Sequence, residues 1–344
     1  MLYNIDETRM LWGAKNSLPL GKKPRSLPME LLIFLLVSTI ATTAQSILIS
    51  IVTVALMFGD PKYYELAFSD NVTSEAITKY AEEFAKDLPD WILALSLFGC
   101  VFMILTTIIY CKKFEKRKAY TFGFSTRSFG LEYLAGLLIG TVMISLPVLF
   151  CFITGCVSFS FGSGTPWMIA LYFLAFLVQA MGEEVMFRGY LLTTLARKNN
   201  IWVAVAFSSL FFALFHAGNA SFSIIGFVNL ALFGFFAAIV TLRRGSIWAI
   251  SAIHAAWNFA QGNVFGFNVS GTPMTDTLLA TKQNNFGAIL SGGEFGLEGG
   301  LGATIVLLVA ILLVLMSPTK KSETVKLEDN DDTDDYDSFE EIRF

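Results

Sequence analysis

The chain has 344 residues, of which 54% are hydrophobic and only 15% are charged, and it carries a formal net charge of −4. Because soluble globular domains have about 25% charged residues, this composition excludes an ordinary soluble protein and favours one that crosses a membrane several times. The polar segments are too short to fold separately, so we expect one transmembrane domain at 29–316, an N-terminal segment at 1–28 and a tail at 317–344.

Apolar runs along the chain predict membrane-spanning helices, each of which needs about 20 apolar residues to cross about 30 Å of hydrocarbon. Eight runs meet this condition, at 30–58, 91–111, 131–156, 167–192, 201–217, 224–242, 246–267 and 299–316. We therefore expect an all-α fold, a polytopic membrane bundle of about eight transmembrane helices. In the third run, Gly136 and Gly140 form a small-xxx-small face, which predicts close packing against another helix.

Two loops between the runs are long. The loop at 59–90 carries eight acidic residues against three lysines, and its segment 74–87 has the pattern of an amphipathic surface helix. The loop at 269–298 is rich in Gly and Ser and has no clear period, so the sequence says little about its structure. In the tail, nine of the fourteen residues of Glu328–Glu341 are acidic, a composition typical of disordered segments.

The distribution of basic residues predicts the orientation of the bundle. If the N-terminus is cytoplasmic, the segments on the cytoplasmic side hold twenty Lys and Arg residues and those on the outer side hold four. Cytoplasmic loops carry this excess of positive charge in membrane proteins. We expect both termini to be cytoplasmic and the protein to be integral to a membrane, with a bacterial cell membrane as the expected location.

The fourth run contains two adjacent carboxylates and a guanidinium, those of Glu183, Glu184 and Arg188. A charge at the centre of a membrane helix costs about 2.5–3.5 kcal/mol on insertion scales, so such groups pair or face a polar cavity. Glu184 and Arg188 are four residues apart and share a helix face, which predicts a supporting ion pair. Glu183 points about 100° away and has no partner nearby in the sequence, so we predict that it carries the chemistry.

Both histidines of the chain, His216 and His254, fall in apolar runs, and Asn258 follows His254 by one helical turn. Glu183, His216 and His254 could ligate zinc and leave one position open for a water. Alternatively, Glu183 and His216 could activate a water directly while His254 and Asn258 bind the oxyanion formed at a scissile carbonyl. The absence of an HExxH motif excludes a zincin arrangement, but spacing leaves both mechanisms open.

These residues must meet in one polar cavity for either mechanism to operate. Counted at about 1.5 Å per residue from the ends of their runs, Glu183 and His254 fall in the cytoplasmic half of the bilayer, whereas His216 falls nearer the outer face. Helix tilt, or burial of 189–200 within the bilayer, would bring the three side chains to one depth.

At these residues the chain resembles the CAAX-protease and bacteriocin-processing family of intramembrane proteases, which includes the type II CAAX prenyl endopeptidases. That family is marked by the motifs EExxxR, FxxxH and HxxxN on successive membrane helices. All three are present, as Glu183-Glu184-x-x-x-Arg188, Phe212-x-x-x-His216 and His254-x-x-x-Asn258. The resemblance covers about 130–265 and leaves the first two runs, the eighth run and both tails outside it.

The resemblance implies a bundle around a cavity and cleavage of a peptide bond near the membrane surface. It implies that Glu183 activates the water with His216 as its partner, and that His254 and Asn258 bind the oxyanion or a metal. We expect an intramembrane endopeptidase, of the metallo- or glutamate type with zinc as the metal in the first case, that acts on a prenylated or membrane-associated peptide or protein.

Two alternatives belong to other functional classes. The chain could be a non-catalytic self-immunity factor or scaffold that uses the same cavity for binding alone. A transporter with a proton relay is disfavoured, because the polar groups cluster in one region and no inverted repeat is apparent. We expect membrane lipid and a peptide or lipidated protein as partners, and no nucleic acid.

Overall fold

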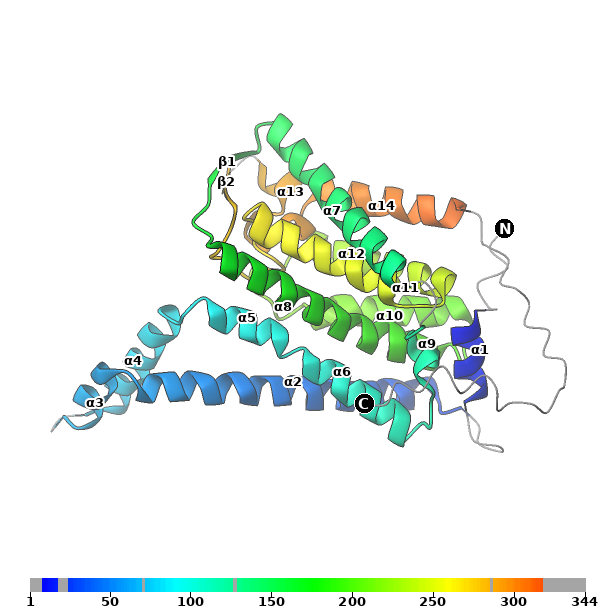
Figure 1. Ribbon diagram of the computed structural model, residues 1–344, viewed down its shortest axis with the longest axis horizontal. Coiled ribbons are helices and arrows are strands. Elements are labelled where there is room, and N and C mark those ends of the chain that lie inside the picture. The colour runs from blue at the N-terminus through cyan, green and yellow to red at the C-terminus, as the bar shows by residue number, and fades with distance from the viewer. Residues whose placement is uncertain (1–7, 18–23, 70–71, 126–128, 285–286, 318–344) are drawn as a thin grey trace.

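The computed structural model describes residues 8–17, 24–69, 72–125, 129–284 and 287–317, so the acidic segment Glu328–Glu341 lies outside the described residues. The chain forms a helical bundle with one two-stranded sheet (Figure 1). Its longer helices are α1 Arg9–Asn16, α2 Leu27–Phe58, α3 Pro61–Ala67, α4 Ser74–Lys86, α5 Trp91–Phe98, α6 Val101–Lys113, α7 Phe129–Ile153, α8 Pro166–Glu184, α10 Ile201–Phe215, α11 Ile224–Arg244, α12 Trp248–Phe259 and α14 Leu301–Met316. Its short elements are η1 Ala119–Phe122, β1 Val157–Phe161, η2 Val185–Leu192, α9 Thr193–Leu195, η3 Ala260–Val264, β2 Leu279–Gln283, α13 Ala288–Ser291, η5 Gly293–Phe295 and η6 Leu297–Gly299.

Within the described ranges, five helical stretches are long and apolar enough to cross a membrane, which makes the chain an all-α integral membrane protein as predicted. They are Leu27–Phe58, Trp91–Lys113, Phe129–Ile153, Pro166–Leu195 and Ile224–Arg244. The predicted surface helix at 74–87 is also confirmed, as α4. The predicted orientation of the termini stays a prediction.

Three of the predicted spans form shorter helices. The runs at 201–217, 246–267 and 299–316 give α10, α12 and α14, with 15, 12 and 16 residues. At 1.5 Å per residue these helices are about 18–24 Å long, less than the thickness of the hydrocarbon. Asn200 caps the start of α10, and α12 runs on without a gap into the π-helix η3, so helical structure there extends as far as Val264.

The fourth predicted run, 167–192, is confirmed and ends three residues later in the structure. The α8 helix continues through η2 and α9 as far as Leu195, and its last turns are buried. The fully buried Arg117 holds this end, since its guanidinium donates hydrogen bonds to Thr193 Oγ1 at 2.6 Å and Gly189 O at 3.3 Å. Arg117 is one of the twenty basic residues that the sequence places on the cytoplasmic side, and it is buried among hydrogen-bond acceptors instead of exposed in a loop.

The α8 and α12 helices lie at the centre of the bundle and pack against each other (Figure 1). The α7 helix covers α12, α10 packs on α11, and α2 packs on α6. The α3 and α4 helices project from the bundle at the far end of α2 (Figure 1). The bundle therefore brings segments from both sides of the 130–265 region around α8.

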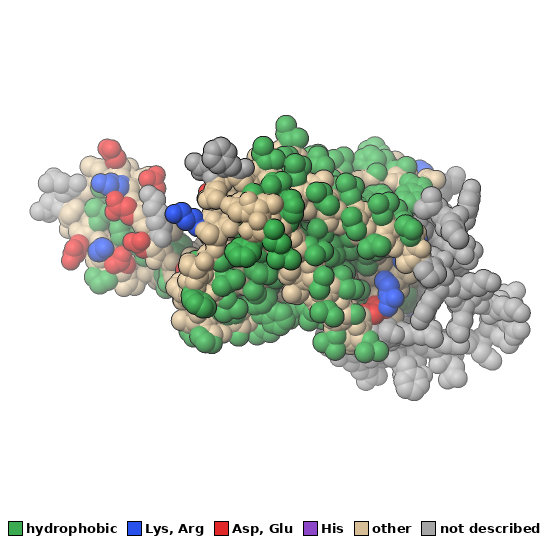
Figure 2. Space-filling model, turned by 90° about the horizontal axis from the view of Figure 1, so that it is seen from above, with side chains coloured by type: hydrophobic (Ala, Val, Ile, Leu, Met, Phe, Trp, Pro, Cys, Tyr) green, Lys and Arg blue, Asp and Glu red, His purple; other side chains and the backbone are tan. Residues whose placement is uncertain are grey.

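The surface of the bundle is apolar, as contact with lipid requires. On α7, the side chains of Leu131, Leu138 and Ile153 are 77%, 67% and 73% exposed. Figure 2 shows hydrophobic side chains over much of the visible face and charged ones gathered at the projecting α3–α4 end. Soluble monomers rarely expose continuous apolar surface of this extent, so the apolar face is the lipid-facing one.

The two-stranded sheet was not predicted. The β1 strand pairs antiparallel with β2, and Phe159 lies opposite Thr281. The β2 strand falls in the loop at 269–298, for which the sequence showed no period. This pairing fastens the end of α7 to the loop that follows α12, and so helps to hold residues 269–274 over the cavity.

The small-residue face of α7 packs directly on α12. A Cβ atom at Gly136 would lie 2.5 Å from the backbone oxygen of Ala249, and one at Gly140 would overlap the backbone oxygen of Ile253. Ile253 precedes His254, so the close approach of α7 sets the position of a site residue. The predicted helix packing through Gly136 and Gly140 is confirmed.

We expect Gly140→Ala to lower the free energy of unfolding by about 1–3 kcal/mol, since the added methyl group meets backbone that cannot rotate away. Gly130→Ala is the matched control on the same helix, because a Cβ atom there would have no neighbour within 4 Å. Thermal unfolding of the two variants in detergent measures the difference. Equal melting temperatures for Gly140→Ala and Gly130→Ala would contradict the packing described here.

Candidate active site

One cavity of about 330 Å³ lies between α2, α5, α8, α10, α11 and α12, and segments before and inside α14 close it. Glu183, His216, His254 and Asn258, the four residues predicted to carry the chemistry, all line it. The four side chains therefore meet in one cavity, although the sequence alone placed His216 at a different depth from Glu183 and His254. The predicted polar cavity is present, and what each residue does in it stays a prediction.

Glu183 lies in the last turn of α8, where its side chain is 12% exposed. Gln179, one turn earlier, donates a 2.6 Å hydrogen bond to Glu183 Oε1 and accepts one of 3.1 Å from Asn258 Nδ2. The other oxygen, Oε2, accepts no hydrogen bond from the described residues and lies 3.8 Å from His254 Nε2. One oxygen of Glu183 is thus fixed by Gln179, while the other is buried without a hydrogen-bond donor among the described residues.

His254 is oriented by Glu184. Its Nδ1 lies 2.9 Å from Glu184 Oε1, and because a carboxylate oxygen accepts, Nδ1 is the donor. The ring therefore presents Nε2 towards Glu183. Carboxylates that bind the rear nitrogen of a functional histidine fix its tautomer and raise its basicity.

The predicted ion pair between Glu184 and Arg188 is present and fully buried. Arg188 Nη1 lies 3.1 Å from the same Glu184 oxygen that receives His254, and Nη2 donates to Gly234 O at 3.4 Å. The guanidinium also stacks over the ring of Phe212, 4.4 Å from its centroid. Glu184 thus joins the structural pair to a site residue, a link that the sequence did not reveal.

His216 ends α10 on another wall of the cavity. Its Nδ1 lies 2.8 Å from the carbonyl oxygen of Phe212, which can only accept, so Nδ1 is the donor. In the neutral ring Nε2 then carries the lone pair. No nitrogen of His216 lies within 4.0 Å of a Glu183 oxygen, so the histidine beside Glu183 is His254.

Two π-helical segments begin immediately after the polar residues of the central helices. The η2 segment starts at Val185, directly after Glu184, and η3 starts at Ala260, two residues after Asn258. Such widened turns occur often at functional sites, because they change the direction of side chains along a helix. Gly182 permits α8 to approach the start of α6 closely, because a Cβ atom at this position would lie 2.7 Å from the backbone oxygen of Cys100.

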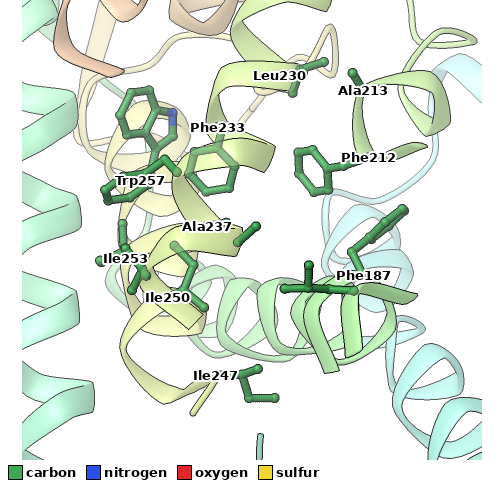
Figure 3. Packing of buried hydrophobic residues seen from close by; sticks show 14 of the residues in the cluster. Phe187, Phe212, Ala213, Leu230, Phe233, Ala237, Ile247, Ile250, Ile253 and Trp257 are labelled. Atoms are coloured by element: carbon green, nitrogen blue, oxygen red, sulfur yellow. The ribbon is translucent and has the colours of Figure 1, made fainter. Parts of the chain in front are cut away.

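Aromatic side chains surround the polar groups. Figure 3 shows Phe212 from α10 facing Phe233 from α11, with Phe187 and Trp257 nearby. The ring centroids of Phe212 and Phe233 are 5.8 Å apart, and the ring centroid of His254 lies 4.9 Å from that of Phe233. A surrounding of this kind lowers the local dielectric constant and strengthens every electrostatic interaction in the cavity.

The arrangement does not form a metal site. Across the described residues, no three His, Cys, Asp or Glu side chains are grouped so that they could hold a metal ion. The Nδ1 bonds of His216 and His254 would leave both Nε2 atoms free to bind a metal, but no nitrogen of His216 lies within 4.0 Å of a Glu183 oxygen, and His254 Nε2 lies 3.8 Å from Glu183 Oε2. Glu183, His216 and His254 therefore do not fit zinc as they stand, and zinc at this site stays a prediction.

The sequence analysis missed a second carboxylate in the cavity wall, Glu298 of η6. Its Oε2 accepts hydrogen bonds from Ser270 N at 2.7 Å and Ser270 Oγ at 2.8 Å. Burial raises the pKa of Glu298, while the hydrogen bonds from Ser270 and the nearness of His216 act in the opposite direction. The available signal was its position, directly before the eighth apolar run.

Comparison with known proteins gives one finding. Residues 165–260 match the family model described as type II CAAX prenyl endopeptidase Rce1-like. The match confirms the resemblance over less than a third of the chain, and this segment contains all three motifs. It supports a protease-like function in a membrane protein. Searches of curated proteins and of solved structures found no match.

Proposed function

We propose that this chain is an intramembrane endopeptidase that hydrolyses a peptide bond of a membrane-associated peptide with a water activated by Glu183. One observation carries the proposal: the cavity that gathers all four predicted residues also leaves Oε2 of Glu183 without a hydrogen-bond donor, beside His254 Nε2. A carboxylate in low-dielectric surroundings that has one free oxygen is suited to accept a proton from a bound water.

In the proposed reaction, the water loses a proton to Glu183 Oε2 as its oxygen forms a bond to the scissile carbonyl carbon. The carbonyl oxygen becomes an oxyanion, to which Asn258 Nδ2 and the protonated Nε2 of His254 donate hydrogen bonds. Glu184 stabilises the positive charge on that imidazole. The carbon–nitrogen bond then breaks, and the proton held by Glu183 passes to the leaving amine.

His216 acts as the partner of Glu183 from another wall of the cavity, where the lone pair of its Nε2 can accept a hydrogen bond from the water that Glu183 deprotonates. Its bond to the carbonyl oxygen of Phe212 holds the ring in one tautomer. The polar groups sit among aromatic side chains in a volume of about 330 Å³, enough for a short stretch of peptide. The substrate is prenylated or otherwise held at the membrane, which raises its local concentration near the cavity.

The proposal is tested with the purified chain in lipid nanodiscs and a quenched, membrane-tethered peptide. Hydrolysis above the rate in empty nanodiscs is expected. A chain that binds such peptides but never cleaves them would contradict the proposal and favour the non-catalytic alternative.

We expect 1,10-phenanthroline to leave the rate of hydrolysis unchanged, because the site residues do not form a three-ligand group. Metal analysis of the wild type beside His216→Ala is the accompanying measurement. Stoichiometric zinc in the wild type that disappears from His216→Ala, together with inhibition by the chelator, would assign the metal mechanism instead.

A further inference from the structure

The cavity holds one carboxylate that the proposed reaction does not use. Glu298 comes from η6, outside the family-matched segment 165–260, yet it lines the same cavity as Glu183 and is only 8% exposed. Burial of a carboxylate is costly unless it is paired with a cation or hydrogen-bonded. Its position in the wall raises the question of what it binds.

Glu298 is held rigidly from one side. Ser270 donates two hydrogen bonds to Oε2, and Asn229 Nδ2 donates one of 2.7 Å to the backbone oxygen of Glu298. Ser270 adopts a left-handed backbone conformation, with φ at 47°, which is uncommon for a residue with a side chain. No described residue donates a hydrogen bond to Oε1, so half of this fixed carboxylate remains available.

The charges of the cavity wall favour a cation in that position. Among the described residues that line the cavity, Glu183 and Glu298 are the carboxylates, none is Lys or Arg, and His216 and His254 are the imidazoles. With His254 protonated, as in the proposed reaction, two carboxylates and one imidazolium leave the wall with a net negative charge. Arg188 lies behind the wall and is neutralised by Glu184. A ligand carboxylate would therefore meet repulsion, whereas an ammonium or guanidinium group would offset the cost of keeping Glu298 ionised.

We infer that Glu298 is a specificity-determining residue that binds a Lys or Arg side chain of the peptide substrate through its free oxygen. The inference rests on the proposed function for the nature of the ligand as a peptide. It assigns the loop at 269–298 a role: Ser270 fixes the carboxylate, and the β1–β2 pairing holds the loop at the bundle.

Binding, which needs no catalysis, tests the inference. The ligands are non-cleavable peptides that are tethered to the membrane by an acyl chain and blocked at their ends by acetylation and amidation. Each peptide carries a single Lys, at a different position in each member of the series. In the control peptides norleucine replaces this Lys. Affinities are measured for the full chain and its Glu298→Gln variant in nanodiscs of zwitterionic lipid, which removes attraction of Lys to anionic lipid. The Glu294→Gln variant is the matched control, since Glu294 lies in the same loop but is exposed and does not line the cavity.

At one position we expect Lys to bind at least tenfold more tightly than norleucine to the wild type and to Glu294→Gln, and less than twofold more tightly to Glu298→Gln. No preference at any position, or the same preference in all three proteins, overturns the inference. Thermal unfolding checks that Glu298→Gln is folded; if it is not, Glu298→Asp, which keeps the charge, must retain a preference for Lys. If the wild type shows the preference for Lys but does not hydrolyse the quenched peptide, the protease proposal alone is overturned.

Discussion

Replacement of Glu183 by Gln is expected to lower kcat for the tethered peptide by about 10²–10⁴-fold, the contribution typical of a positioned general base. Gln has nearly the same volume and keeps an amide oxygen that can accept the hydrogen bond from Gln179, so the fold and the cavity should persist. It cannot accept a proton from water. The loss should therefore appear in kcat, with KM close to that of the wild type.

The control is Glu82→Gln, which removes a carboxylate from the exposed helix α4 and should leave both constants unchanged. Hydrolysis of the quenched peptide in nanodiscs, followed at several substrate concentrations, separates kcat from KM. If Glu183→Gln and the wild type hydrolyse the peptide at equal rates, Glu183 is not the base, and the cavity serves another purpose.

Local spacing predicted the parts of the site that a single helix determines. The pair of Glu184 and Arg188 follows from a separation of four residues and is present at 3.1 Å. The contact of Gln179 with Glu183 has the same separation, so attention to polar residues one turn away would have found it. Both are contacts within one helix, where sequence separation fixes distance.

Contacts between segments were out of reach for the same physical reason. The bond between Glu184 and His254 joins residues seventy positions apart, and Glu298 reaches the cavity through a loop without periodicity. The pairing of β1 with β2 likewise joins segments separated by most of the family-like region. The spacing of residues within one segment does not indicate which distant segment it contacts.

The sequence predicted the fold best where hydrophobicity alone determines whether a segment is helical. The apolar runs became helices, but composition did not show where a helix stops inside the bundle. The change of α12 into η3 and the continuation of α8 through η2 depend on packing and on donors such as Arg117. The α10, α12 and α14 helices are shorter than the runs predicted for them, and each contributes side chains to the cavity. The ends of these helices and the polar site therefore lie in the same part of the bundle.

Glu184 has two partners on one oxygen, which makes its structural and functional effects separable. Arg188→Met leaves the Glu184 carboxylate buried without its cation and is expected to lower the free energy of unfolding by about 3–5 kcal/mol, because an unpaired buried charge is far more costly than a buried pair. The double variant Glu184→Gln/Arg188→Met removes both charges and should recover most of that stability. The exposed pair of Lys79 and Glu83 has the same spacing, and Lys79→Met should change stability by less than about 1 kcal/mol.

Activity should not recover with stability in the double variant. The amide oxygen introduced by Glu184→Gln can still accept the hydrogen bond from His254 Nδ1, but it carries no charge to stabilise an imidazolium, so we expect hydrolysis to remain about 10–100-fold slower than in the wild type. Thermal unfolding and hydrolysis measured on the same preparations separate the two effects. A double variant as unstable as Arg188→Met would show that the ion pair is not the source of the instability. A fully active one would show that Glu184 does not act through His254, and that the proximity of His254 Nε2 to Glu183 suffices for the reaction.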